Sequence, residues 1–524
     1  MTAVAKKYDE DVFHQQFDDL LQRERNGQVT QPVTMKTVRH LAEQAGMPRA
    51  ASAANDNEVQ SVDETMHGAS GDIANGRIFA KLNRGKLLFA HETSETLRFD
   101  DSQGWTRAAP GESERAGKEV IAVLRSAAVE RYKAAPDDPK TKRLMAHIER
   151  SSTAPKITAM ISMAKSEPGM TIQLHQLDAD PFMLGVENGV LDLREGVLLA
   201  ASPDLLVTKR CAVTYDPTET APTWEAFIAR ITGGKTSLAR FLQRLAGYIL
   251  TGDVGEQCFA FLYGLGRNGK TTYAEALRWL LGDYAVILPT STLMMARRDP
   301  GAASPDLMLL KGARLALANE TEESARLAES VVKGLTGGDS ITARDPYGKF
   351  ATWNPTHKLM LVGNHRPVIA GGDWGIWRRV RLIHFTETIA DHECDPQLPD
   401  KIKAEGSGLL NWCLDGYRAW RREGLNPPLE VRGAGDEYRK DMDIVGQWLD
   451  EHTEDSPGAL TATADFYRAY VSWARSSGWH PMTRQSFGRR LTERGIHIRK
   501  GGANSTKCAV GIKLNREGVR ALIE

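Results

Sequence analysis

The sequence has few cysteines, no long apolar run and no excess of charge of either sign. Its five cysteines lie far apart and form no CxxC pair, which indicates neither a disulfide framework nor a zinc site. The N-terminus has no apolar signal core, and no stretch approaches the roughly 20 apolar residues needed to span a bilayer. We therefore expect a protein of the reducing cytoplasm with no membrane segment.

The overall charge balance does not indicate a partner, because 67 Lys and Arg residues offset 67 Asp and Glu residues. Local clusters must show whether the chain binds nucleic acid. The hydrophobic fraction of 41% and the charged fraction of 26% are typical of globular proteins and exclude collagen-like and fully disordered chains. A length of 524 residues exceeds what one ordinary core supports, so we expect about two to four domains.

Composition divides the chain into six segments. Residues 1–48 contain two helix-like stretches, and residues 49–74, with few large apolar residues, are typical of a flexible linker. Residues 75–250 have mixed α/β character, with hairpin signals at Asn188-Gly189 and Glu195-Gly196. Residues 251–390 alternate apolar strands with helices, which predicts a parallel sheet flanked by helices. We expect residues 391–457 to form a helical extension and residues 458–524 a separate small domain.

Apolar spacing predicts several long helices outside the expected parallel sheet. A turn at Pro136 to Pro139 separates the first two of them. The expected helices are residues 116–134, 141–164, 237–251, 409–424 and 436–451.

A phosphate-binding loop of the form G-x-x-x-x-G-K-[ST] occupies residues 264–271. The apolar strand 258–263 runs directly into it, and a helix-like segment follows, as the loop requires. Small residues let successive backbone N–H groups face phosphate oxygens, Lys270 contacts the β and γ phosphates, and the Thr271 hydroxyl coordinates Mg²⁺. The candidate nucleotide contacts are Gly264, Gly266, Arg267, Asn268, Gly269, Lys270, Thr271 and Thr272. A glycine-rich turn that binds nothing is the alternative. Kinases, transporter motors and helicases share this loop, so it predicts only nucleotide binding.

Polar side chains follow two further apolar strands. Glu320 and Glu322 come after strand 314–319, where a carboxylate is able to hold Mg²⁺ or polarise the attacking water. Asn364 comes after strand 358–363, where a neutral amide is able to hold that water or contact the γ phosphate. The alternatives are a solvated acidic helix start for the two glutamates and an ordinary turn former for Asn364.

These motifs resemble the superfamily 3 helicases, in particular the helicase part of phage and plasmid primase-helicases, related to the poxvirus nucleoside triphosphatase. The resemblance extends from about residue 75 to the end, and the N-terminal segment lacks an evident primase domain. The stretches that carry it are residues 178–196, 261–272, 314–323, 332–344, 355–367 and 377–383.

The resemblance implies a P-loop NTPase fold of AAA+-like superfamily 3 type, with an α/β domain before the motor. It implies ATP and Mg²⁺ as cofactors, with Thr271 and Glu320 at the metal and Lys270, Glu320, Glu322 and Asn364 in catalysis. It also implies a homo-oligomeric ring, hexameric in this family, in which Arg378 or Arg379 reaches the neighbouring subunit's nucleotide. Without the resemblance, ordinary surface charge is the simpler interpretation of these arginines.

Two basic regions are candidates for DNA contact. The resemblance implies a hairpin in the ring's pore at residues 343–350, where Lys349, with Arg344 and Tyr347, grips the backbone; the alternative is a solvated lysine. In the C-terminal unit, two helices and a two-stranded wing predict a winged-helix-like domain, and Arg484, Arg489 and Arg490 are its candidate DNA contacts. A solvated basic helix is the alternative there.

The sequence thus predicts a ring-forming, ATP-dependent DNA helicase that replicates a phage, plasmid or integrated element in a bacterial host cytoplasm. Its expected partners are single-stranded DNA, forked or origin duplex and a separate primase or other replication proteins. Three alternatives stay open: an ATP-regulated origin-binding initiator with little unwinding, a primase-helicase with an unrecognised primase activity, and a small-molecule kinase. Asp178 and Asp180 have the D-x-D spacing of nucleotidyl transfer, but we expect structural roles for them.

Overall fold

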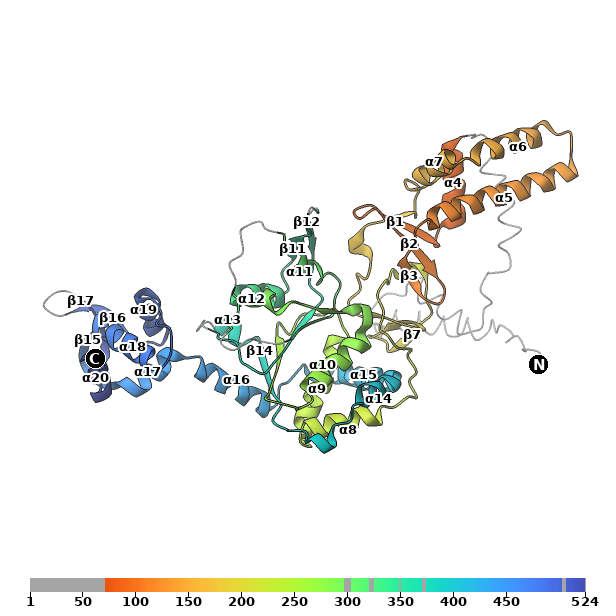
Figure 1. Ribbon diagram of the computed structural model, residues 1–524. Helices are drawn as coiled ribbons and strands as arrows, with labels where there is room; N and C mark the ends of the chain where they lie inside the picture. The colour runs from red at the N-terminus through yellow and green to blue at the C-terminus, as the bar shows by residue number, and fades with distance from the viewer. Residues whose placement is uncertain are drawn as a thin grey trace, which may run out of the picture. The chain divides into compact units, whose positions relative to one another are not determined.

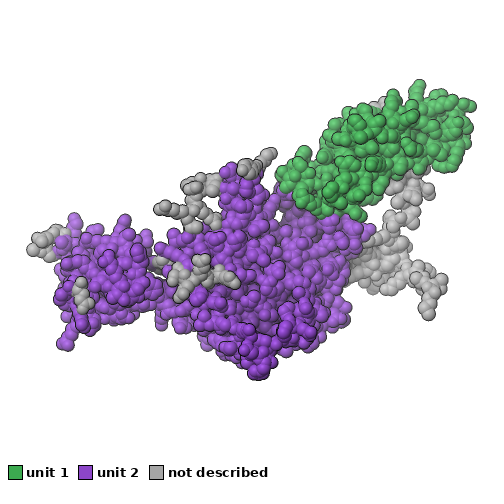
Figure 2. All heavy atoms as spheres, in the orientation of Figure 1, with its two compact units in different colours: residues 1–98, 107–173 green, residues 99–106, 174–524 purple. Residues whose placement is uncertain are grey.

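The computed structural model describes residues 71–295, 303–319, 325–346, 348, 350–369, 374–501 and 506–523 (Figure 1). The chain divides into two compact units (Figure 2). The first comprises Met1–Arg98 and Arg107–Gln173, and the second comprises Phe99–Thr106 and Leu174–Glu524. The helical segment expected over residues 1–48 and most of the linker expected over 49–74 lie outside the described residues.

The described part of the first unit packs four helices with a small sheet. Strand β1 pairs antiparallel with β2 and parallel with β4, and Phe79, Phe89 and Leu124 lie in the core. The prediction of one continuous helix over 141–164 is wrong, because a break at Ser152 separates two helices. The second helix has a proline in its first turn, where the backbone N–H has no partner within the helix. The elements are α4 (Asp72–Asn83), β1 (Leu87–Ala90), β2 (Glu95–Asp100), α5 (Glu112–Ala134), α6 (Pro139–Ser151), α7 (Ala154–Ala164) and β4 (Thr171–Ile172).

The second unit contains the end of β2, most of β3 (Gly104–Arg107) and an antiparallel three-stranded sheet of order β5-β6-β7. Its two tight turns lie at the predicted hairpin signals, where Gly189 and Gly196 have φ values of 150° and 69°. Such values favour glycine, so the sequence signals are confirmed. The strands are β5 (Met183–Val186), β6 (Gly189–Asp192) and β7 (Val197–Leu199).

A five-stranded parallel sheet of order β14-β8-β13-β10-β9 forms the centre of the second unit. Successive residues of β8 belong to different cores: Phe259 and Phe261 pack on one face, and Ala260 and Leu262 on the other. Both faces are therefore covered, which explains the continuous apolar runs and confirms the expected parallel sheet. The strands are β8 (Phe259–Tyr263), β9 (Ala285–Ile287), β10 (Leu315–Asn319), β13 (Lys358–Gly363) and β14 (Val380–His384).

Helices α8, α9, α10 and α15 contribute to the core on one face of this sheet, and α12 and α16 to the core on the other. Helices α9 and α15 pack so closely that their contact requires glycine. A Cβ at Gly247 would lie 2.0 Å from the backbone nitrogen of Tyr417. The elements around the sheet are α8 (Pro222–Ile231), α9 (Thr236–Ile249), α10 (Lys270–Leu281), α11 (Pro305–Met308), α12 (Glu329–Thr336), β11 (Ile341–Arg344), β12 (Phe350–Trp353), α13 (Trp374–Trp377), α14 (Leu398–Ala404), α15 (Gly406–Glu423) and α16 (Leu429–Asp441).

Two buried cations stand at the starts of β10 and β13. Arg314 donates to the carbonyls of Leu250 and Met183, and the Lys358 ammonium donates to the carbonyl of Thr251 and lies 4.7 Å from the centroid of the Tyr248 ring. Burial holds the pKa of Lys358 well below its usual value. Carbonyls at the end of α9 carry the negative end of the helix dipole, which compensates these cations.

The last part of the chain packs around Trp448, which shares a core with Phe466 and Phe487. One helix was expected over 436–451, but two are present, because Asp443 caps a new helix by accepting from the N–H of Gly446. The two helices and the hairpin expected in this region are present, and the structure adds a further strand and a terminal helix. The elements are α17 (Ile444–His452), β15 (Thr453–Ala462), α18 (Thr463–Ser476), α19 (Arg484–Glu493), β16 (Ile498–Gly501), β17 (Thr506–Leu514) and α20 (Arg516–Ile523). In the described parts of the chain, no helix combines the length and apolar character needed to cross a membrane.

Candidate phosphate-binding site

The loop between β8 and α10 has a backbone that requires glycine at three positions. Gly266 and Gly269 both have φ of 80°, in the left-handed region. A Cβ at Gly264 would lie 2.3 Å from Nδ2 of Asn268 and 2.6 Å from the carbonyl oxygen of Phe385. Helix α10 begins at Lys270, immediately after this loop, so the unpaired N–H groups of its first turn border the loop.

Lys270 is held inside the site by Asn268. Asn268 Nδ2 donates to the carbonyl of Phe385 at 3.4 Å, and its Oδ1 accepts from both the backbone N–H and the Nζ of Lys270, each at 3.4 Å. The lysine is only 7% exposed, and desolvation lowers its pKa. Among the described side chains, no carboxylate forms an ion pair with this ammonium. A buried cation of this kind favours a bound anion.

The remaining loop residues expected at the nucleotide are more accessible. Thr271 is exposed at the start of α10, and Thr272 is partly buried. Arg267 is exposed, and its Nη1 lies 2.5 Å from Oδ1 of Asp391. Thr271 is therefore accessible for the metal contact predicted for it.

Three neighbouring strands end at the same edge of the sheet. Tyr263 at the end of β8 pairs with Gly363 at the end of β13, and Val362 pairs with Asn319 at the end of β10. Adjacent strands lie about 4.8 Å apart, so exposed Asn364, which follows β13, is next to the strand that leads into the loop. Glu320 and Glu322, predicted from the sequence after β10, lie outside the described residues.

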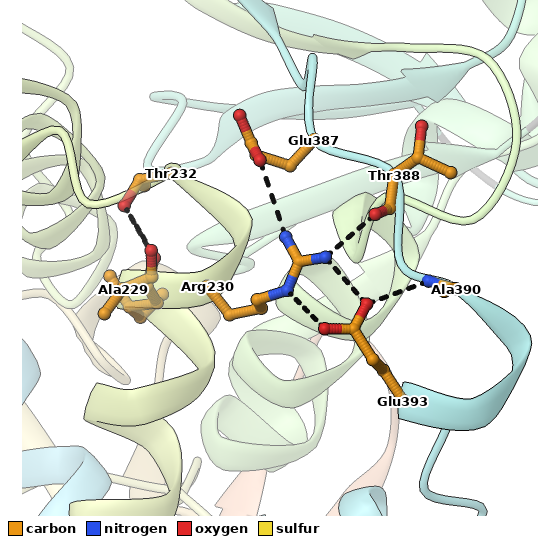
Figure 3. Close-up of polar contacts among 8 residues, drawn as sticks. Ala229, Arg230, Thr232, Glu387, Thr388, Ala390 and Glu393 are labelled. Atoms are coloured by element: carbon orange, nitrogen blue, oxygen red, sulfur yellow. Dashed lines mark hydrogen bonds and ion pairs between the residues drawn. The ribbon is translucent and has the colours of Figure 1, made fainter.

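Arg230 of α8 is the centre of a polar cluster that the sequence did not indicate (Figure 3). Its Nη2 donates to the carbonyl of Thr388 and to Oε2 of Glu393, both at 2.8 Å, and Glu387 lies 3.5 Å from its Nη1. Glu393 also accepts from the backbone N–H of Ala390 at 3.0 Å. The hydrogen bond from Arg230, followed by that from Ala390, lowers the pKa of Glu393 to about 2. The cluster fixes the segment after β14 to α8.

That segment, residues 385–394, is called the strap, and it also contacts the glycine-rich loop between β8 and α10. The N–H of Ile389 donates to the carbonyl of Arg267 at 2.8 Å, in addition to the Phe385 and Asp391 contacts described above. Helix α8 contacts the same loop directly, because a Cβ at Gly269 would lie 2.4 Å from Cγ2 of Ile231. Loop, strap and α8 therefore form one packed unit. Its members are up to 163 residues apart, which explains why no local sequence signal revealed it.

The two arginines after α13 have different surroundings. Arg379 is buried, and its Nη1 donates to the carbonyl of Gly375 at 2.6 Å. Arg378 is exposed, and its Nη2 donates to Oε1 of Gln257 at 3.2 Å. Of the two, only Arg378 has a side chain accessible to a second subunit.

The predicted DNA contacts are distributed over two regions. Arg344 lies in β11, which pairs antiparallel with β12, and its guanidinium is 5.1 Å from the Phe350 ring centroid. Tyr347 and Lys349 lie outside the described residues. On α19, Arg484 and Arg489 are exposed, whereas the side chain of Arg490 is 17% exposed and lies 3.7 Å from Glu493.

The two aspartates with D-x-D spacing make structural contacts, in agreement with the expectation. Asp178 accepts from the N–H and the hydroxyl of Thr208 at 2.8 and 2.5 Å. Asp180 forms a two-bond ion pair with Arg194 at 2.9 and 3.0 Å. Across the described residues, no group of three or more His, Cys, Asp or Glu side chains is placed to hold a metal ion.

Residues 76–233 match the protein family described as D5 N terminal like. The chain is also 28% identical over 327 residues to a protein named as a putative helicase in Acanthamoeba polyphaga mimivirus, which covers 58% of this chain and 34% of the relative. A putative helicase of Frog virus 3 (isolate Goorha) is 28% identical over 269 residues, covering 48% and 27%. A putative primase of African swine fever virus is 24% identical over 330 residues, covering 57% and 34%.

The matched part of the chain spans about a third of the length of these curated relatives. Among solved structures, the apo NrS-1 C-terminal region covers 84% of this chain and 99% of its own, with 11% identity. Its TM-score of 0.46 is too low to establish a shared fold. The family match and the viral relatives confirm the resemblance predicted from the sequence. Over about half of its length, this mixed α/β chain is similar to viral proteins named as putative helicases and putative primases.

Proposed function

We propose that the chain is the motor of an ATP-dependent DNA helicase that acts as a ring, in the form of a hexamer, during replication of a phage, plasmid or other mobile element. The observation that carries this proposal is the buried ammonium of Lys270 at a glycine-built loop, beside the ends of two neighbouring strands. The names of the viral relatives support helicase chemistry over transfer of phosphate to a small molecule.

The residues of the loop fit the phosphates of ATP. The N–H groups at the start of α10 and the Lys270 ammonium offer donors and positive charge. Mg²⁺ bound with the nucleotide neutralises charge on the transferred phosphoryl group. Thr271 and Glu320 are the proposed metal ligands, and Glu322 is a second carboxylate for catalysis. Asn364 is proposed to orient the attacking water.

A ring places the nucleotide between subunits, and Arg378 is the proposed residue that one subunit presents to its neighbour's ATP. Its fixed positive charge suits the charge that develops during phosphoryl transfer. Buried Arg379 is proposed instead to support the turn after α13 through the Gly375 carbonyl. DNA is the proposed polymer, contacted by the hairpin with Arg344, Tyr347 and Lys349 and by the C-terminal unit. A separate primase and other replication proteins are proposed partners.

Mixed-subunit ATPase assays test the proposal. Lys270→Ala and Arg378→Ala proteins should each lose DNA-stimulated ATP hydrolysis, because each lacks one half of a shared site. In a random equal mixture, about a quarter of the interfaces combine an intact lysine with an intact arginine, so about a quarter of the activity should return. Arg418→Ala, which removes an exposed arginine paired with Asp415 at 2.6 Å, is the matched control.

Three results would contradict this function. ATP hydrolysis that is indifferent to DNA would favour a small-molecule kinase. An inactive mixture of the two variants, with both proteins folded and assembled, would refute the shared site. ATP-dependent DNA binding without strand displacement on a forked duplex would refute helicase action.

Primer synthesis is a second candidate, because one group of viral relatives carries the name primase. The alignment with that relative covers 57% of this chain. Incorporation of labelled nucleotides into a product on a single-stranded template would support primer synthesis. A template-dependent product that persists in the Lys270→Ala variant would separate it from ATP hydrolysis.

A further inference from the structure

A basic groove lies between α19 and the hairpin of β16 and β17. It has a volume of about 750 Å³, and five cationic residues line it, whereas no Asp or Glu among the described residues does. The five are Arg484, Arg489, Arg499, Lys500 and Lys507. An exposed concentration of one charge of this kind attracts a polyanion.

Two of these lysines are placed where they destabilise the hairpin. Lys500 of β16 lies directly opposite Lys507 of β17, and both are exposed. Like charges in directly opposite positions of an antiparallel pair repel each other. Farther along β17, Lys513 is instead neutralised by Glu454 at 3.0 Å. The hairpin therefore carries two opposed, like charges at the groove, whereas Lys513, away from the groove, is compensated by Glu454 of β15.

On the helix side of the groove, the charge of Arg484 is also in an unfavourable position. It is the first residue of α19, and the first turn of that helix contains no acidic residue. The positive end of the helix dipole disfavours a cation there and favours an anion. Arg489, one turn later, has only a loose contact of 3.6 Å with Glu493. The charges on both sides of the groove thus oppose local stability and favour a bound anion.

The groove lacks the features of a single-strand site. Among the described residues that line it, Phe487 is the one aromatic; it is 1% exposed and packs in the domain core, so it offers no face on which a base stacks. Flexible arginine and lysine side chains around a groove instead suit phosphate oxygens, whose contacts position a duplex without reading its sequence.

We propose that this groove binds the phosphate backbone of duplex DNA independently of sequence. The proposal rests on the proposed function only for the choice of DNA as the polyanion. It adds Arg499, Lys500 and Lys507 of the hairpin to the helix residues expected from the sequence. Residues 458–524 would then hold the duplex while the motor acts on one strand.

Equilibrium binding of the full chain to fluorescent duplex, without nucleotide, tests this surface over a range of salt concentrations. Each phosphate contact contributes about 0.9 to the slope of log affinity against log salt. A Lys500→Ala, Lys507→Ala double variant should lower the slope by about 1.8, and therefore weaken binding by about 60-fold at 0.1 M salt. Two unrelated duplex sequences should show the same loss. Lys513→Ala is the matched control on the same strand and should change neither quantity.

Several outcomes would overturn the proposal. They are an unchanged slope in the double variant, an equal loss in Lys513→Ala, or a larger loss on single-stranded than on duplex DNA. A loss confined to one duplex sequence would also overturn it. The double variant removes a repulsive pair, so its thermal midpoint should not fall, and arginine at both positions should retain binding. Because the assay contains no ATP, its result is independent of whether the motor hydrolyses nucleotide or unwinds DNA.

Discussion

Replacing Gly269 by alanine is expected to damage the phosphate-binding loop more than replacing Gly266, although both glycines have φ of 80°. Either alanine carries the cost of a left-handed backbone, about 1–2 kcal/mol. At Gly266 nothing lies within 4 Å of the added Cβ. At Gly269 the Cβ would meet Cγ2 of Ile231 at 2.4 Å and Cε2 of Phe227 at 3.0 Å.

Both of those neighbours belong to α8 and are buried in the core, so they have little room to move. Overpacking of this kind costs about 1–3 kcal/mol. The loop of the Gly269→Ala protein is expected to relax to another conformation, which ATP must reverse in order to bind. The affinity for ATP should then fall by about 5- to 150-fold more in Gly269→Ala than in Gly266→Ala.

Calorimetric titration of a non-hydrolysable ATP analogue measures the two affinities, and a double-mutant cycle locates the cause. Ile231→Ala removes the atom that meets the new Cβ, so it should recover part of the affinity that Gly269→Ala loses. It should not improve the Gly266→Ala protein. Equal losses for the two glycine variants, or an additive cycle with Ile231→Ala, would refute the packing explanation.

Three further predictions concern ionisable groups in the second unit. Arg230→Ala should weaken ATP binding at neutral pH by releasing the strap from α8, and Arg418→Ala should not. The stability contribution of the Arg230–Glu393 pair should be complete above pH 4.5, the usual pKa of Glu393, and decline as the pH falls toward 2. His357 is buried, and burial followed by the neighbouring Lys358 lowers its pKa to about 4. The unfolded chain then binds a proton that the folded chain does not, so urea midpoints should fall as the pH drops from 6.5 to 4. A His357→Leu variant should flatten that decline, and an unaltered pH profile would refute the assignment.

Features that depend on a few neighbouring residues were predicted correctly. The strand, the glycine-rich loop and the helix within residues 258–281 were all predicted, because glycine positions and apolar runs act locally. Helix ends were harder to place. The break at Ser152 depends on a proline in the first turn of α7, and the break before α17 depends on the Asp443 cap. Continuous apolar spacing conceals such caps.

The sequence by itself determined the kinds of elements, the covered parallel sheet and the residues at its strand ends. Only the tertiary structure decided that β13 lies between β8 and β10, which brings Asn364 beside the loop strand. It also joined Arg230 to the strap, buried Arg379 while exposing Arg378, and set Lys500 opposite Lys507. The physical reason is that periodicity records whether a residue faces an apolar surface. The identity of its neighbour depends on chain topology and on packing between distant segments.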